Sequence, residues 1–243
     1  MIEYGQLSLE GYMHKDMSIG KQDSVYVLNS PDIFIGIICD GCTSVNGAFS
    51  NNHVGASLIS EFLAIKINEQ YKIENNVLKS IKIAISKANS LIKTITRKFN
   101  NDSQYVEEFK LRYFLMTFIG SVIVNNHVYI FGKGDCSYGF EDKKYTLENN
   151  DKLFLRSNTF RLYYENFVTK KPIWIASDGF HDSLLDQNTF NLFQSFISDN
   201  QTYEPISKKS NPAMRSFRRI IYNKNKKMFP DDISIITMKI KDL

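Results

Sequence analysis

Residues 32–40 read Asp-Ile-Phe-Ile-Gly-Ile-Ile-Cys-Asp, and Gly41 follows directly. The run is rich in Ile and Phe with almost no polar interruption, which is typical of a β-strand covered on both faces. Because it stops abruptly in Asp40-Gly41, the pattern predicts a carboxylate at a strand tip. We expect the glycine to let the backbone turn sharply, so that the Gly41 carbonyl points the same way as the Asp40 carboxylate. Two such oxygens suit Mg²⁺ or Mn²⁺, although Asp-Gly also begins many ordinary turns.

The composition fits one globular domain spanning residues 1–243. The chain has 43% hydrophobic residues and 18 Phe, enough for a large core. It shows no linker, repeat or bilayer-spanning apolar run, and its first ten residues lack a basic start and an apolar signal core. Three cysteines argue against a disulfide framework, and the net charge of +4 is modest. We therefore expect a cytoplasmic protein that binds neither membranes nor nucleic acid.

Alternation and helical spacing predict elements along the rest of the chain. Apolar residues at steps of three and four predict a helix over 51–66, with Val54, Leu58, Phe62 and Ile65 on its buried face, and a second helix over 77–99. Residues 100–104 read as a loop, residues 143–171 could not be assigned, and helices are expected over 180–198 and 212–228. The predicted strands are 6–13, 23–29, 113–124, 127–131, 137–141, 172–176 and 233–240, with a hairpin turn at 29–32 and a two-residue turn at Asn125-Asn126.

Acidic residues recur at the ends of these apolar strands. Besides Asp40, they are Asp135 after the 127–131 strand, Asp178 after the 172–176 strand, and Asp231 and Asp232 before the last strand. One such site would be a turn, but four of them suggest carboxylates that converge on a metal site.

The chain resembles the bacterial type 2C class of metal-dependent protein serine/threonine phosphatases. The resemblance covers nearly all of it and rests on Gly20-Lys21-Gln22-Asp23-Ser24, Cys39-Asp40-Gly41, Gly134-Asp135-Cys136, Ser177-Asp178-Gly179 with Asp182 behind it, and Asp231-Asp232-Ile233-Ser234. It implies an α+β fold, a four-layer sandwich of two antiparallel sheets flanked by helices. It also implies two Mn²⁺ or Mg²⁺ ions, with a third in many bacterial members.

The resemblance assigns roles to individual residues. Asp40 would bridge both ions, the Gly41 carbonyl would bind one of them, and Asp178 and Asp231 would bind the other. Asp23 would orient water from behind these ligands, and Asp135 would join Asp178 at a third ion. Asp232 is expected to stay outside the ligand set. The paired ions would activate water for in-line attack on a phosphoserine or phosphothreonine of a protein substrate, whose phosphorylation implies a cognate kinase.

The chain also departs from the family pattern. Gln22 replaces a common acidic residue, Ser18 stands where a phosphate-binding arginine is usual, and Cys42-Thr43-Ser44 follows Gly41. His14, Lys15 or Lys21 could bind phosphate instead, and His181 could serve as an acid, although each is also compatible with an ordinary structural role. These departures keep a second reading open, in which the domain is catalytically weak or inactive and binds a ligand or partner. A third reading, nucleic-acid binding by the basic residues of 212–228, lacks an aromatic stacking set.

All three cysteines lie beside proposed ligands. Because adjacent residues of a strand face opposite sides, Cys39 and Cys136 are expected to be buried as small hydrophobic residues. Cys42 lies two residues after Asp40, so we expect it to be the most reactive thiol.

Overall fold

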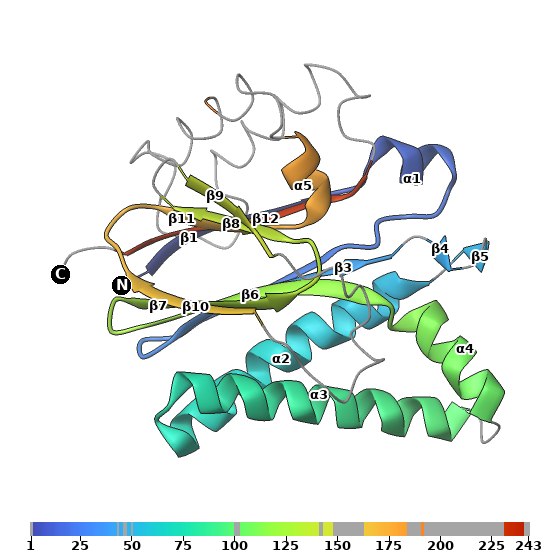
Figure 1. Ribbon diagram of the computed structural model, residues 1–243, viewed down its shortest axis with the longest axis horizontal. Coiled ribbons are helices and arrows are strands. Elements are labelled where there is room, and N and C mark those ends of the chain that lie inside the picture. The colour runs from blue at the N-terminus through green and yellow to red at the C-terminus, as the bar shows by residue number, and fades with distance from the viewer. Residues whose placement is uncertain are drawn as a thin grey trace.

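The computed structural model describes residues 2–42, 44–45, 48–49, 51–99, 103–140, 143–147, 163–183, 191 and 231–240. Two five-stranded antiparallel sheets stack on each other, with a separate two-stranded ribbon of β4 (Ser44–Val45) and β5 (Ala48–Phe49) at one end (Figure 1). The first sheet has the order β1 (Ile2–Leu9), β12 (Ile233–Ile240), β11 (Ile173–Ala176), β8 (Ser137–Phe140), β9 (Lys143–Thr146). The second has the order β10 (Tyr163–Val168), β7 (His127–Lys133), β6 (Met116–Val124), β3 (Phe34–Gly41), β2 (Ser24–Asn29).

Three helices cover the outer face of the second sheet, as Figure 1 shows: α2 (Asn52–Glu74), α3 (Val77–Phe99) and α4 (Ser103–Tyr113). Two short helices, α1 (Tyr12–Asp16) and α5 (Asp178–Ser183), lie beside the first sheet. Among the described helices, none has both the length and the apolar character that crossing a bilayer requires.

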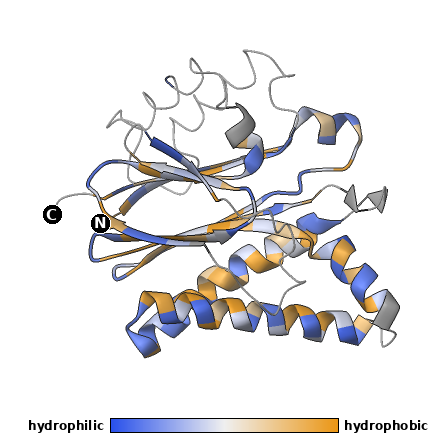
Figure 2. Ribbon diagram, viewed as in Figure 1, coloured by the Kyte–Doolittle hydropathy of each residue, from blue (hydrophilic) through white to orange (hydrophobic). Residues whose placement is uncertain are grey.

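Strand β3 contributes to both layers of the core by alternation. Phe34 and Ile38 point into the space between the sheets, whereas Ile35 and Ile37 point toward the helices, and all four are at most 1% exposed. Buried apolar residues of α3, such as Ile81 and Ile85, belong to the same core as Ile35 and Ile37. Figure 2 shows hydrophobic and hydrophilic residues alternating along this helix. The expected α+β sandwich is confirmed, and the Asp40 strand is covered on both faces as its composition predicted.

Most predicted elements are present. The β2–β3 hairpin, the long helix over 77–99 and the strands over 127–131, 137–141, 172–176 and 233–240 are confirmed, with ends that shift by at most two residues. The two-residue turn at Asn125-Asn126 has φ angles of 48° and 66°, as a type I′ hairpin turn requires. Within the unassigned 143–171 segment the structure describes β9 and β10. The predicted helix over 212–228, and that over 180–198 beyond Ser183, lie outside the described residues.

Three predictions about helix and strand positions were wrong. The strand expected over 6–13 ends at Leu9, and the chain turns into α1 because the Gly11 amide donates a hydrogen bond to Asp232. The loop expected over 100–104 gives way at Ser103 to α4, so the following strand starts at Met116 instead of residue 113. Helix α2 continues to Glu74 and buries a different face from the one predicted.

The buried face of α2 consists of small residues and a few large ones. Val54 and Leu58 are 49% and 38% exposed, whereas Gly55 and Ala56 face the sheet. A Cβ atom at Gly55 would lie 1.9 Å from the Tyr113 carbonyl oxygen, so close packing rather than bulk decides which side of α2 is buried. A pattern based on large apolar residues could not detect this.

Candidate metal centre

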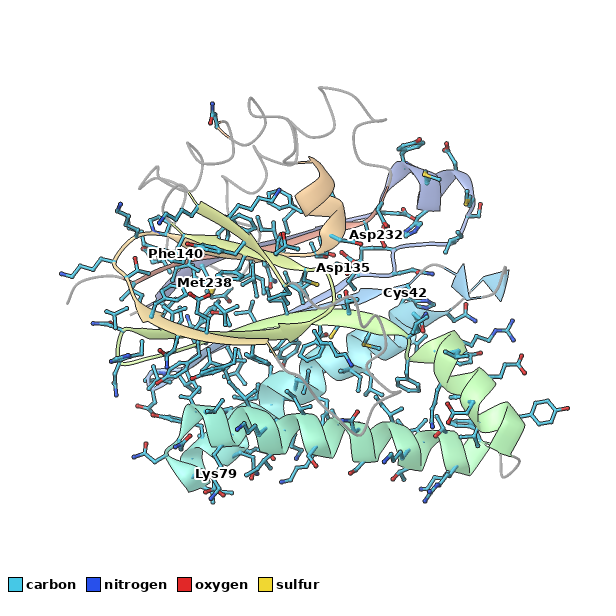
Figure 3. The ribbon with its side chains drawn as sticks, in the orientation of Figure 1. Cys42, Lys79, Asp135, Phe140, Asp232 and Met238 are labelled. Atoms are coloured by element: carbon cyan, nitrogen blue, oxygen red, sulfur yellow. The ribbon has the colours of Figure 1, made fainter. Side chains whose placement is uncertain are left out.

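Strand register brings the predicted acidic residues to one end of the sandwich. Ser24 pairs with Cys39, so β2 begins beside the end of β3 and Asp23 lies close to Asp40. In the other sheet Ala176 pairs with Ile235, so the end of β11 meets the start of β12 and Asp178 approaches Asp231. Figure 3 shows Asp135, Asp232 and Cys42 at this same end of the molecule. Residues more than 200 positions apart in sequence therefore share one site.

Gly41 is needed for close packing and not for a turn. It continues β3 and pairs with Met116, and its φ angle is not positive. A Cβ atom there would lie 2.9 Å from the Gln22 carbonyl oxygen. The sharp turn expected from the sequence is therefore absent, and the glycine instead lets β3 approach the segment that carries Asp23.

Buried Asn52, the first residue of α2, fixes the chain that follows Gly41. Its amide nitrogen donates to the Cys42 carbonyl at 2.8 Å, and its side-chain oxygen accepts from the Leu115 amide at 2.8 Å. The Cys42 amide in turn donates to the Leu115 carbonyl at 3.1 Å. This clamp holds the strand end that carries Asp40, and no feature of the sequence distinguished Asn52 from an ordinary helix-start residue.

The β11–β12 junction is fixed in a similar way. The Ser177 amide donates to the Ser234 carbonyl, and the Ser234 amide donates to the Ser177 hydroxyl at 2.9 Å. Asp178 directly follows this pair. On the third acidic segment, Gly134 has a φ of +109° and packs against Thr117, which turns the chain just before Asp135.

Electrostatics show that these carboxyl groups act on one another. Burial, together with the charges of Asp23, Asp178 and Asp231, raises the pKa of Asp40 well above its ordinary value. Burial also raises the pKa of Asp178, and its carboxyl group shares a hydrogen bond with that of Asp40. Asp135 adds to the repulsion at Asp178. Without a cation, burial and the neighbouring like charges favour the protonated form of both carboxyls.

Asp23 is a second buried carboxyl, only 4% exposed. Burial and the neighbouring charge of Asp232 raise the pKa of Asp23 to about 7, although the Ser177 and Ser234 hydroxyls favour its ionised form. Oδ2 of Asp23 and Oδ2 of Asp40 are both buried without a hydrogen-bond partner. Leaving two such oxygens unsatisfied is costly, and a divalent cation would satisfy them. The residues at this end of the sandwich therefore fit the expected ions.

Asp232 holds the segments around the site together. Its carboxylate accepts hydrogen bonds from the backbone amides of Gly11, Gln22 and Asp23, and it lies 3.0 Å from Nδ1 of His14. With 2% exposure and these partners, Asp232 serves the protein's own chain, consistent with the expectation that it lies outside the ligand set. The sequence did not show that it anchors the Asp23 segment.

The candidate phosphate-binding residues are placed as follows. His14 is buried against Asp231 and Asp232, so its imidazole faces carboxylates. The Lys21 ammonium donates to the Ser8 hydroxyl at 2.8 Å, and Lys15 is exposed on α1. Exposed Ser18 has a φ of +56° and ends α1, so the position expected for an arginine is a helix end here. The side chains of His181 and Asp182 lie outside the described part of the structure.

The burial predicted for Cys39 and Cys136 is confirmed, although Cys136 lies between β7 and β8 and not in a strand. Cys39 and Cys136 are completely buried, in the helix-facing and the inter-sheet core respectively, and burial raises the pKa of both thiols. Cys42 is partly exposed.

No family model and no curated protein matches this sequence. Solved structures do match over its whole length. A variant of a bacterial serine phosphatase aligns with a TM-score of 0.67 and 11% identity, covering 99% of both chains. The serine/threonine phosphatase of S. agalactiae aligns at 0.62 and 12%, covering 99% of this chain and all of the other. The catalytic domain of the serine/threonine phosphatase PstP, solved with two manganese ions, aligns at 0.60 and 14%, covering 99% of both.

At sequence identities of 11–14%, the similarity to these structures establishes the fold alone. The two stacked five-stranded sheets and the helices of the described residues are the architecture that these matches share. This protein therefore has the α+β sandwich fold of the bacterial type 2C serine/threonine phosphatases.

Proposed function

We propose that this protein is a metal-dependent phosphatase that hydrolyses phosphoserine and phosphothreonine on proteins. The observation behind the proposal is the pair of buried carboxylate oxygens without hydrogen-bond partners, on Asp23 and Asp40, next to the like charge of Asp178. Such an arrangement stores repulsion that divalent cations would relieve. The similarity in fold to a phosphatase solved with two manganese ions supports the same reading.

The proposed ligands are Asp40, the Gly41 carbonyl, Asp178 and Asp231, with Asp135 at a third position. When bound, Mn²⁺ or Mg²⁺ would supply Lewis acidity and make water a nucleophile near neutral pH. Asp23 is buried and adjoins Asp40 through the strand register, so its carboxylate can accept a hydrogen bond from water beside the ligands. It would thus orient that water.

The substrate class follows from the proposed chemistry and from the fold. A phosphoserine or phosphothreonine carried by a protein is the proposed substrate, and a serine/threonine kinase that makes it is the proposed counterpart in bacterial signalling. We propose no role in binding nucleic acid or membranes.

A second function, a binding module without hydrolysis, is favoured by one observation. The segment from His14 to Gln22 presents a helix end at Ser18 and an amide at Gln22 where the family resemblance implies an arginine and an acid. Such a protein would bind Mn²⁺ but release no phosphate.

Hydrolysis distinguishes the two functions. The purified protein should hydrolyse a small aryl phosphate and a phosphothreonine peptide in the presence of Mn²⁺ and lose both activities with a chelator. Tight Mn²⁺ binding with no hydrolysis of either substrate would favour the binding module.

A further inference from the structure

A buried imidazole stands between two carboxylates at the edge of the proposed centre. His14, on α1, is 4% exposed. Its Nδ1 lies 3.0 Å from Oδ1 of Asp232, and its Nε2 lies 3.4 Å from Oδ1 of Asp231. The ligand atoms of these three residues all lie within 4.8 Å of one another. Since a histidine has two distinct nitrogens, each contact implies its own role.

The two carboxylates differ in their surroundings. The Asp232 side chain is 1% exposed and accepts hydrogen bonds from the Gly11 and Gln22 amides, so it is committed to the protein's own main chain. The Asp231 side chain is 48% exposed. The 3.0 Å contact with Asp232 thus positions Nδ1 of the imidazole, and Nε2 faces the carboxylate that the proposed function makes a metal ligand. A carboxylate behind the far nitrogen is typical of metal-binding histidines.

The spacing of Nε2 and Asp231 fits one shared ion. Two ligand atoms that each lie about 2.1 Å from an ion are roughly 3.0 Å apart at octahedral angles and roughly 3.4 Å apart at tetrahedral ones. The observed 3.4 Å falls in this range without any movement of the side chains. Asp23, whose Oδ2 is buried without a partner, also acts electrostatically on His14. Three carboxyl groups, those of Asp23, Asp231 and Asp232, therefore act on one imidazole.

We propose that Nε2 of His14 is a ligand of the ion bound by Asp231, with Asp232 as the residue that orients the imidazole. This inference rests on the metal centre of the proposed function. It adds a nitrogen ligand to a set in which every ligand expected from the sequence is an oxygen. Imidazole favours transition metals, whereas Mg²⁺ prefers oxygen ligands. The site should therefore prefer Co²⁺, Fe²⁺, Zn²⁺ or Mn²⁺ to Mg²⁺.

The test compares Co²⁺ and Mg²⁺ binding by calorimetry in the wild type, His14→Asn and the control His127→Asn. The asparagine amide can replace Nδ1 against Asp232 but offers nothing at the Nε2 position, so orientation is kept and the ligand is lost. His127 is exposed at the start of β7, on another element. We expect His14→Asn to weaken Co²⁺ binding by about tenfold or more while Mg²⁺ binding changes far less. The visible spectrum of bound Co²⁺ should change as well.

Equal losses for Co²⁺ and Mg²⁺, or no loss for either, would overturn the proposal and leave His14 as a partner of the two carboxylates. A measurement on the wild type avoids dependence on a variant. Pulsed electron paramagnetic resonance of the Mn²⁺-loaded protein should show coupling to a directly bound imidazole nitrogen, and its absence would also overturn the proposal. Both readouts report binding. Failure of hydrolysis alone would therefore count against the proposed function and not against His14.

Discussion

Gly179 packs directly on the main chain of Asp232, so closely that a Cβ atom at position 179 would lie 2.1 Å from the Asp232 carbonyl oxygen. This contact sets the distance between the two segments that carry Asp178 and Asp231. The Asp178-Gly179 pair, which indicates a strand end in the sequence, thus has a packing function in the structure.

Replacing Gly179 with alanine should separate these segments. We expect Gly179→Ala to lower the free energy of unfolding by about 1–3 kcal/mol, as overpacking does, and to weaken Mn²⁺ binding. Gly36→Ala is the matched control, because its nearest contact is the flexible end of Ile236 at 3.0 Å. Urea unfolding and calorimetry would measure both effects. Mn²⁺ binding that falls equally in the two variants would contradict the packing role of Gly179.

Replacing Asp40 or Asp178 with asparagine should abolish activity without unfolding the metal-free protein. We expect Asp40→Asn and Asp178→Asn to abolish Mn²⁺-dependent hydrolysis while the metal-free protein stays folded. For Asp40→Asn the metal-free protein should become at least as stable as wild type, because burial and neighbouring carboxylates raise the pKa of Asp40. Asp32→Asn, an exposed change in the β2–β3 turn, should alter neither property. Near wild-type hydrolysis by a folded Asp40→Asn protein would refute the ligand assignment.

The metal-free protein should lose stability as pH rises from about 4 to about 7. Burial and Asp232 raise the pKa of Asp23 to about 7, so the folded protein retains a proton that the unfolded chain releases. The free energy of unfolding should then fall by on the order of 1.4 kcal/mol per pH unit for each such carboxyl. The raised pKa of His14, caused first by its hydrogen bond to Asp232, extends this loss above pH 6.5.

Urea midpoints between pH 5 and 8, measured with a chelator and with saturating Mn²⁺, test the pH dependence. Mn²⁺ should flatten or reverse the slope, because it binds the ionised carboxylates. If the free energy of unfolding of the metal-free protein increased from pH 5 to 7, the pKa values of these carboxyl groups would not be raised in the folded protein.

Asp135 should affect turnover more than tight metal binding. It lies on the β7–β8 connection, and its charge acts on Asp178. We expect Asp135→Ala to keep the tighter Mn²⁺ sites in a calorimetric titration and to reduce the rate of hydrolysis. Loss of all Mn²⁺ binding would instead place Asp135 among the first two sites.

Cys42 should react before the other cysteines. It is partly exposed beside Gly41, whereas burial raises the pKa of the Cys39 and Cys136 thiols. Iodoacetamide should therefore modify Cys42 first and reduce hydrolysis, and Cys42→Ser should resist this inactivation. Mass spectrometry at partial inactivation identifies the modified residue, and early labelling of Cys39 with Cys42 intact would be evidence against the prediction.

How much the sequence could predict depended on how local each signal was. The strand over 32–40 and the turn at Asn125-Asn126 were detectable, because alternation, apolar runs and turn residues act over a few positions. The convergence of Asp23, Asp40 and Asp178 could be proposed from strand ends and from the family resemblance.

Features that depend on packing between distant segments were not predictable. The buried face of α2 was misassigned because Gly55 meets Tyr113 across 58 positions of sequence. The anchoring role of Asp232 requires hydrogen bonds to residues more than 200 positions away. The contact of His14 with Asp231 and Asp232 could not be recognised in the sequence, because the β1–β12 pairing brings these residues together.

Phosphate release from a phosphothreonine peptide is the direct test of whether this protein is a metal-dependent phosphatase. Wild-type protein and Asp40→Asn should be compared in parallel, each with Mn²⁺ and with a chelator, after unfolding curves confirm that both are folded. We expect phosphate release by the wild type with Mn²⁺ alone, and none by Asp40→Asn or with the chelator. Wild-type protein that binds Mn²⁺ and releases no phosphate, or release that continues unchanged in the chelator, would contradict this expectation.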